Sequence, residues 1–229
     1  MPLAKTGLRP MRGRRFGIFA AATAIGFLYW FPARRRFATW GTTGDERERG
    51  MPGDSIIPNP THVASSAVTI DASPDKIWPW LVQIGYQRGG LYSYDWLDRL
   101  FGFLDRSSAD RILPEFQHLA IGDEVSLGPR ETLTVAAAEP NRALVLSSNQ
   151  HGMDWVWQWG LYPIDDHRTR LVSRSTERMP RNVATWLVMR VMEPAAFVMG
   201  RRMLLGLKQR AESMSMGAAA EPLHSRQAP

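Results

Sequence analysis

The second half of the chain alternates between apolar and polar residues, and this pattern constrains the fold more than any other feature. Five segments follow the period of two that half-buried strands require: residues 124–127, 133–138, 143–148, 154–162 and 169–176. The links between them are short and contain turn formers such as Gly128-Pro129 and Pro140-Asn141. Because short links join consecutive strands when those strands run antiparallel, the pattern predicts an antiparallel meander.

One of these predicted strands, residues 154–162, contains a row of three tryptophans. Trp155, Trp157 and Trp159 alternate with smaller or polar residues, so strand geometry places the three indoles on one face of the sheet. A packed core face would explain this row. The wall of a ligand cavity would explain it equally well, since aromatic side chains commonly line pockets.

The segment 73–102 is rich in aromatic residues and predicts two short helices before the meander. Ser73 and Pro74 form a helix start signal, and Gly89-Gly90 opens a turn before the second helix, which ends at Gly102. Residues 63–70, just upstream, alternate as a further strand. Two such apolar helices need a sheet to cover or a ligand to hold.

The C-terminal part of the chain has a helical pattern that is interrupted at Glu193-Pro194. Proline inside a helix removes a backbone hydrogen bond, so the sequence predicts one helix over 183–192 and a longer one from Pro194. The longer helix carries an apolar stripe at helical spacing: Ala196, Met199, Gly200, Met203, Leu204, Leu207 and Ala211. Its methionines suit a core, or a wall that adapts to varied ligands.

The N-terminal segment 16–33 carries no charge and is near the lower limit of about 17 residues for crossing a bilayer. Tyr29 and Trp30 lie at one end, as interfacial aromatics do. The alternatives are a cleaved signal peptide and an apolar helix docked on the domain. Arg34-Arg35-Arg36 is a poor cleavage context, so we favour a retained membrane anchor. Basic residues flank both ends and leave its orientation open.

These patterns divide the chain into four parts: a basic-flanked apolar segment, 1–36; a Pro- and Gly-rich tether, 37–61; a folded domain, 62–212; and a disordered tail, 213–229. The net charge of +6 is concentrated near the two ends, beside apolar sequence. Nucleic-acid binding instead requires a basic stripe with stacking aromatics on a folded face. We therefore expect a membrane surface, and no nucleic acid, as the acidic partner.

The order of predicted elements, together with several sequence segments, resembles the START-like helix-grip superfamily, also called SRPBCC. The segments are TWGTTGDE (39–46), MPGDSIIPNP (51–60), PDKIWPWLVQIG (74–85), RGGLYSYDWLDRLFG (88–102) and EPAAFVMGRRMLLGLKQRAE (193–212). The similarity covers residues 40–212 and is greatest to the bacterial branch of polyketide cyclase/dehydrase and lipid transport proteins.

This resemblance implies an α+β fold in which a curved antiparallel sheet wraps around a long C-terminal helix and encloses an apolar cavity. The N-terminal apolar helix would lie outside that domain. The resemblance also implies binding of lipids, sterols, polyketides or hormones, with catalysis in only some members. It supplies no set of catalytic residues.

The predicted ligand-binding residues come from the aromatic helices, the tryptophan row and the methionine-bearing helix: Trp78, Tyr92, Tyr94, Trp96, Trp155, Trp157, Trp159, Met199, Met203 and Leu207. Asp95 is a weak catalytic candidate, because apolar surroundings raise the pKa of a carboxyl group. We favour the alternative that Asp95 caps a helix or pairs with Arg88 or Arg99. The five histidines lack metal-ligand spacing, so we expect no metal and no cofactor.

Three functions are compatible with these features. The leading hypothesis is binding or transport of an apolar small molecule or lipid between the sheet and the C-terminal helix. The alternatives are a polyketide cyclase/dehydratase-like enzyme using a cavity carboxylate or tyrosine, and a structural or interaction protein with a packed core. We expect a membrane-associated protein with a single N-terminal span, the alternatives being a cytoplasmic or a secreted protein.

Overall fold

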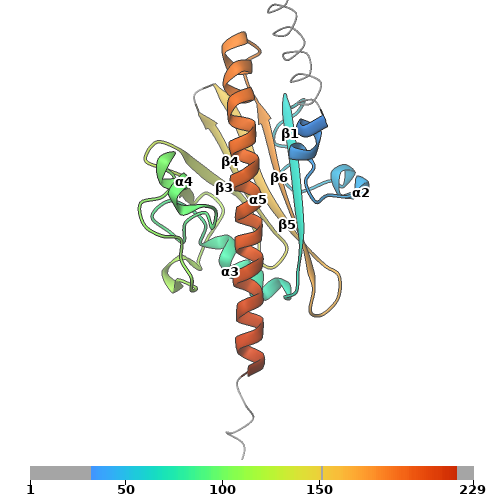
Figure 1. Ribbon diagram of the computed structural model, residues 1–229, viewed down its shortest axis with the longest axis vertical. Coiled ribbons are helices and arrows are strands. Elements are labelled where there is room, and N and C mark those ends of the chain that lie inside the picture. The colour runs from blue at the N-terminus through green and yellow to red at the C-terminus, as the bar shows by residue number, and fades with distance from the viewer. Residues whose placement is uncertain (1–31, 151, 221–229) are drawn as a thin grey trace, which may run out of the picture. The chain divides into compact units, whose positions relative to one another are not determined.

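A computed structural model describes residues 32–150 and 152–220. The chain forms two compact units, residues 1–36 and 37–229, and the second contains the sheet. The predicted anchor, 16–33, lies outside the described residues except for its last two positions. The elements are α2 (Gly44–Glu48), β1 (His62–Ile70), α3 (Pro74–Val82), α4 (Asp95–Leu100), η1 (Pro114–Phe116), β2 (Glu124–Ser126), β3 (Thr132–Glu139), β4 (Ala143–Gln150), β5 (Met153–Pro163), β6 (Thr169–Arg178) and α5 (Val183–Ala220) (Figure 1).

Within the described residues, six strands form one antiparallel sheet in the order β1-β6-β5-β4-β3-β2. The last five strands are consecutive neighbours, so the predicted meander is confirmed. The strand predicted at 63–70 is β1, which pairs with β6. A bulge between Val135 and Ala137 adds a local bend to β3. The predicted fold class is therefore confirmed as a curved antiparallel sheet with a long C-terminal helix (Figure 1).

The prediction of two C-terminal helices separated at Pro194 is wrong. The helix α5 continues from Val183 to Ala220 with Pro194 inside it. Proline removes one backbone donor, while each further helical residue adds a hydrogen bond, so a long helix can continue through the interruption. The same helix includes residues 213–220, where the sequence predicts a disordered tail, and residues 221–229 lie outside the described part.

The main core lies between the second half of α5 and the face of the sheet that we call the inner face. Met203, Leu204, Leu207 and Ala211 of α5 are buried in one apolar cluster with Trp159 of β5. The same cluster includes apolar side chains of α3, β3, β4 and β6. Burial of the stripe predicted for this helix therefore fixes α5 on the sheet.

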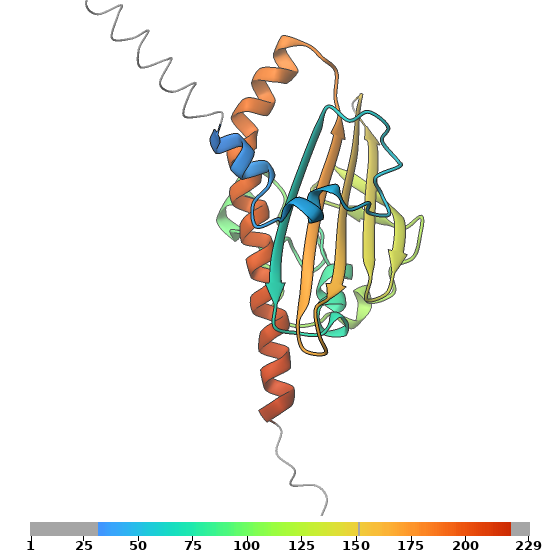
Figure 2. The same cartoon turned by 90° about the vertical axis from the view of Figure 1, so that its right-hand side faces the viewer.

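The opposite, outer face of the sheet is covered by residues 41–60, which we call the strap. Figure 2 shows the strap crossing the face that is turned away from α5. Ile57 packs with Val145 and Val156 of the sheet, and Met51 packs in a second small cluster. Gln158, fully buried, accepts a hydrogen bond from the backbone N–H of Gly53 (2.9 Å). The strap lies within the segment 37–61 that the sequence predicts as a tether.

A buried guanidinium fastens the strap to the sheet. Arg174 of β6 is 5% exposed and donates to the backbone carbonyls of Glu46, Arg47 and Arg49 at 3.0–3.1 Å. It also forms an ion pair with Asp54, 2.5 Å away. One side chain therefore satisfies three carbonyls and a carboxylate of the strap.

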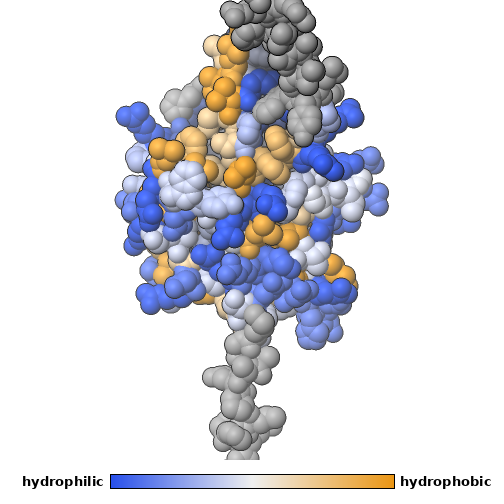
Figure 3. Space-filling model, viewed as in Figure 1, coloured by the Kyte–Doolittle hydropathy of each residue, from blue (hydrophilic) through white to orange (hydrophobic). Residues whose placement is uncertain are grey.

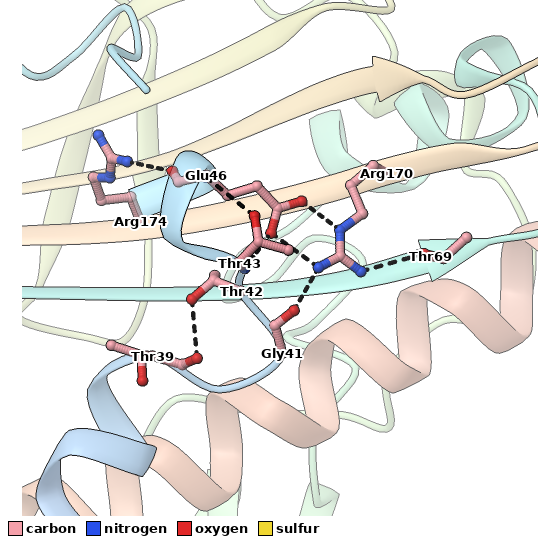
Figure 4. A network of polar contacts seen from close by, with 8 residues as sticks. All are labelled: Thr39, Gly41, Thr42, Thr43, Glu46, Thr69, Arg170 and Arg174. Atoms are coloured by element: carbon pink, nitrogen blue, oxygen red, sulfur yellow. Dashed lines mark hydrogen bonds and ion pairs between the residues drawn. The ribbon is translucent and has the colours of Figure 1, made fainter. Parts of the chain in front are cut away.

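A second arginine of β6 holds the beginning of the strap (Figure 4). Arg170 donates to both carboxylate oxygens of Glu46, at 2.7 and 3.0 Å, and to the carbonyl of Gly41. Thr43 and Glu46 form a reciprocal capping box at the start of α2. Glu46 thus links a helix cap to the sheet.

We expect Arg174→Met to lower the free energy of unfolding by about 3–5 kcal/mol, because removing one partner of a buried ion pair leaves polar groups unpaired. Urea unfolding provides the measurement. Arg142→Met is the matched control: Arg142 is 80% exposed in its pair with Glu139, and its loss should cost less than ~1 kcal/mol. Equal losses in the two variants would contradict a structural role for the strap.

Candidate functional site

The tryptophan row of β5 lies on the inner face, as the alternation predicts. The rings of Trp155 and Trp157 stack with centroids 5.7 Å apart, and those of Trp157 and Trp159 are 4.4 Å apart. The indole N–H of Trp155 donates to the Ser175 hydroxyl at 2.8 Å, and that of Trp157 donates to the Ser173 hydroxyl at 3.3 Å. The hydroxyls of β6 thereby fix the orientation of two rings.

The contact between this row and α5 changes from one end to the other. Trp159 is fully buried together with Met203 and Leu207, so these predicted ligand-binding residues lie in a packed cluster and not beside an open gap. Trp155 and Trp157 are only partly buried where they pack on the same cluster. The inner face is therefore closed at Trp159 and more open at Trp155.

The helix shows the same change along its length. From residue 183 to residue 202 no side chain of α5 is buried, and Met199 is partly exposed. From Met203 onward the helix contributes four residues to the core. Protein atoms therefore leave two surfaces of the inner face partly uncovered. One is the first half of α5, and the other is the Trp155 end of the tryptophan row.

A carboxyl group lies at this open end. Glu177, near the end of β6, pairs in register with Trp155 on one side and with His62 on the other. The Ser175 hydroxyl, which accepts from the Trp155 indole, donates to the Glu177 carboxylate at 3.0 Å. Burial raises the pKa of Glu177. The charge of His62 and the hydrogen bond from Ser175 oppose this shift, and the charge of Glu193 on α5 adds a smaller upward contribution.

A carboxyl group in this setting can donate a hydrogen bond when protonated and accept one when ionised, or act as a proton donor. Sequence reasoning missed Glu177 because the predicted strand stops at residue 176. The available signal was the alternation itself: Ser173, Ser175 and Glu177 occupy successive positions on the face that carries the tryptophan row.

The predicted catalytic candidate has a structural partner. Asp95 accepts hydrogen bonds from the backbone N–H of Ser108 (3.2 Å) and from its hydroxyl (2.8 Å), so it ties a loop to α4.

Asp98, a second carboxyl group of α4, is fully buried and accepts a hydrogen bond from the Ser93 hydroxyl at 2.5 Å. Burial raises the pKa of Asp98, the hydrogen bond from Ser93 opposes this shift, and the charge of Asp95 adds to it. Both carboxyl groups organise the segment around α4.

Tyr92, another predicted ligand-binding residue, is 1% exposed and donates its hydroxyl hydrogen bond to the carbonyl of Trp80 at 3.1 Å. Burial raises its pKa. Its backbone has φ +57°, and its carbonyl lies so close to Gly206 of α5 that a Cβ there would be 2.2 Å from the oxygen. Tyr92 therefore fixes the loop against α5.

The remaining aromatic candidates do not gather at one site. Trp78 is partly buried and packs on the core cluster. Tyr94 is 37% exposed beneath the Arg202 guanidinium, and Trp96 is 66% exposed on α4. The structure thus brings together the tryptophan row, Met203 and Leu207, and leaves Trp96 in solvent.

A pocket of about 460 Å³ lies where the strap meets β3, β4 and β5, and its lining combines outer-face residues with Trp155 of the tryptophan row. Its lining is mostly polar and includes the Asp154–Arg178 ion pair. The lining residues are Ile56, Ile57, Thr132, Thr134, Ser147, Ser148, Asn149, Gln150, Asp154, Trp155 and Arg178. Its polar lining, which includes no residue of α5, differs from the apolar cavity that the resemblance implies between the sheet and α5.

No family model and no curated protein matches the chain. Among solved structures it is similar to the Zhui aromatase/cyclase from a Streptomyces species, with 16% identity and a TM-score of 0.41 over 69% of this chain and 97% of that one. It is also similar to a polyketide cyclase-like protein from Corynebacterium glutamicum, with 16% identity and a TM-score of 0.39 over 75% and 100% of the two chains.

A third similar structure is norcoclaurine synthase from Thalictrum flavum, with 12% identity and a TM-score of 0.41 over 67% and 96% of the two chains. The chain has the six-stranded antiparallel sheet and long C-terminal helix of the helix-grip architecture, as the sequence resemblance implies.

The raised pKa of Glu177 predicts a pH effect on stability. Its contribution is fully present below the ordinary value of 4.5 and is lost as the pH rises through the higher pKa of the folded state. Glu177→Gln resembles the protonated form, so the free energy of unfolding should fall less with rising pH in this variant than in the wild type. Urea unfolding at pH values on both sides of 4.5 provides the measurement.

Glu46→Gln is the control of opposite sign. The hydrogen bond from Arg170 lowers the pKa of Glu46, so its stabilisation is present above 4.5 and is lost as the pH falls. This variant should lose most stability relative to the wild type at neutral pH. Parallel pH profiles for Glu177→Gln and the wild type would show that Glu177 titrates as an ordinary surface group.

Proposed function

We propose that the protein binds an apolar small molecule or lipid at the open end of the inner face, beside Trp155 and Trp157. The observation that carries this proposal is the change in burial along one helix and one strand. Where α5 is packed, Trp159 is covered; where α5 has no buried side chain, Trp155 and Trp157 are left partly exposed. Stacked, half-covered indoles offer a large apolar contact surface.

The polar groups at this end favour a ligand that also carries a hydroxyl, carbonyl or similar group. Ser175 already connects the Trp155 indole to Glu177, and the raised pKa of Glu177 keeps a hydrogen-bond donor available at higher pH than usual. An apolar body would lie on the indoles while its polar group reaches Glu177. Binding sites of this kind combine apolar lining with a few placed polar groups.

The proposal includes a membrane tether. The uncharged segment 16–33, with basic residues on both sides and Tyr29 and Trp30 at its end, supports a single N-terminal span. A membrane location would also give the site direct access to apolar molecules dissolved in the bilayer. The supported localisation is therefore membrane association of the whole chain.

We expect purified full-length protein to retain an apolar molecule that solvent extraction and mass spectrometry detect. Trp155→Ala should reduce the amount retained about tenfold, because truncating a central aromatic contact typically costs more than ~1 kcal/mol of binding. Trp96→Ala should leave it unchanged, since Trp96 is 66% exposed on α4. An extract without any bound molecule would instead favour an interaction protein with a packed core.

A second candidate function is a cyclase/dehydratase-like activity with Glu177 as the proton donor. The favouring observation is the hydrogen-bond chain from Trp155 through Ser175 to a carboxyl group whose pKa burial raises. General acids need a pKa near the working pH. This assignment replaces Asp95, whose oxygens are engaged by Ser108.

The two candidates differ in what Glu177→Gln does. For a dehydratase, the wild type should release a product lighter than the bound molecule by one water, while Glu177→Gln retains the molecule unchanged in mass. Mass spectrometry of the bound and released fractions over time separates these outcomes. If the bound and released molecules of the wild type have identical masses, the protein binds its ligand without catalysing a dehydration.

A further inference from the structure

The first half of α5 presents large apolar side chains to solvent. Figure 3 shows apolar residues along the upper part of this helix. Six of them between residues 183 and 198 are 43–75% exposed: Val183, Trp186, Leu187, Val188, Val191 and Val198. Isolated exposed apolar residues are common, but a continuous apolar surface marks an interaction site.

The spread of these residues around the helix indicates what covers them. At ~100° per residue, the exposed apolar positions occupy about 200° of the helix circumference. Packing against one neighbouring helix or sheet requires a stripe only about 100° wide. A second helix would therefore leave much of this surface uncovered, whereas lipid contacts a helix from all free sides.

The charges of this segment are arranged to tolerate an apolar environment. Its two charged residues, Arg190 and Glu193, pair with each other at 3.5 Å. The Arg190 guanidinium also lies over the Trp186 ring, 5.0 Å from its centroid. Tryptophan and arginine are typical of the membrane–water interface, where the ring and the aliphatic stem meet lipid and the polar ends meet water.

The first residue of the folded unit, Phe37, contacts the same half of α5. Phe37 stacks on Phe197 of α5, with ring centroids 4.5 Å apart. Residue 33, the end of the apolar segment, is joined to Phe37 by no more than ~14 Å of extended chain. If the segment spans a bilayer, as proposed above, Phe197 lies close to the bilayer surface.

The helix as a whole is not a second span. Among the described residues, Val183–Ser215 is long and apolar enough to cross a membrane by length and composition. Its second half, however, is buried against the sheet through Met203, Leu204, Leu207 and Ala211. A membrane contact is therefore restricted to the first half.

We propose that residues 183–198 of α5 insert into the lipid interface. This inference rests on the proposed membrane tether and adds a second contact from the folded domain. The charge of Glu193, in the inserted half, is close enough to raise the pKa of Glu177 by repulsion, so the open end of the inner face lies beside the inserted half. A bilayer molecule can then reach Trp155 and Trp157 without crossing water.

The test uses the full-length chain, which contains no cysteine, so that single cysteines can be labelled without background. Leu187→Cys and Val191→Cys carry nitroxide labels in vesicles of phosphatidylcholine and phosphatidylglycerol. Ser213→Cys, exposed near the other end of α5, is the matched control. Electron paramagnetic resonance measures collisions with oxygen, which concentrates in lipid, and with a water-soluble nickel complex.

The ratio of oxygen to nickel collisions should be several-fold higher at positions 187 and 191 than at 213. A low ratio at all three positions would place the segment in water and overturn the proposal. Low accessibility to both reagents at 187 and 191 would also overturn it, because it would show that protein, either the N-terminal segment or a second copy, covers the helix. None of these readouts depends on ligand binding.

A second measurement connects this contact to the site. Leu187→Glu combined with Val191→Glu should slow several-fold the uptake of a fluorescent fatty acid from vesicles. Uptake of the same probe from detergent should be unchanged. Ile164→Glu is the control, because Ile164 is 50% exposed in the link between β5 and β6. Equal uptake from vesicles by the double variant and by Ile164→Glu would contradict the proposed membrane contact. If the wild type takes up no probe from vesicles or from detergent, only the proposed ligand function is contradicted.

Discussion

The whole fold depends on the requirement that the sheet be covered on both faces. Along β5, Trp155, Trp157 and Trp159 point to one side, while Val156 and Gln158 point to the other, and both sets include fully buried residues. A period of two makes this separation unavoidable. The helix α5 covers the inner set and the strap covers the outer set. Arg174 holds the strap in place because its buried guanidinium donates hydrogen bonds to three backbone carbonyls of the strap.

The two covers differ in completeness, and this difference generates the candidate site. The strap fits the middle of the outer face closely: a Cβ at Gly53 would lie 2.7 Å from Val145. The helix covers the inner face only from Met203 onward. Before that point α5 has no buried side chain, so the same helix is a core element at one end and an exposed apolar surface at the other. The proposed ligand site and the proposed membrane contact are two consequences of this one asymmetry.

Several features could be predicted from particular residues because they depend on local periodicity. The strands, their antiparallel order and the single-faced tryptophan row all follow from alternation over short segments. Other predictions failed or stopped short because distant contacts decide them. Glu177 lies one residue beyond the predicted strand end, and its pKa depends first on burial and then on the charge of His62, which lies on β1 more than 100 residues earlier in the chain. Pro194 lies inside a continuous helix, although proline favours a break. Asp95 is engaged by Ser108 instead of an arginine.

The sequence by itself determined the strands, the apolar stripe of the C-terminal helix and the facing of the three indoles, because side-chain direction follows directly from backbone period. Only the tertiary structure decided which part of that stripe meets the sheet and which part stays exposed. It also decided that the Pro- and Gly-rich segment becomes a strap, because Arg170 and Arg174 find their partners there more than 100 residues away along the chain. Burial, and the pKa values and contacts that follow from it, depends on which distant surfaces meet, and local sequence patterns do not specify that.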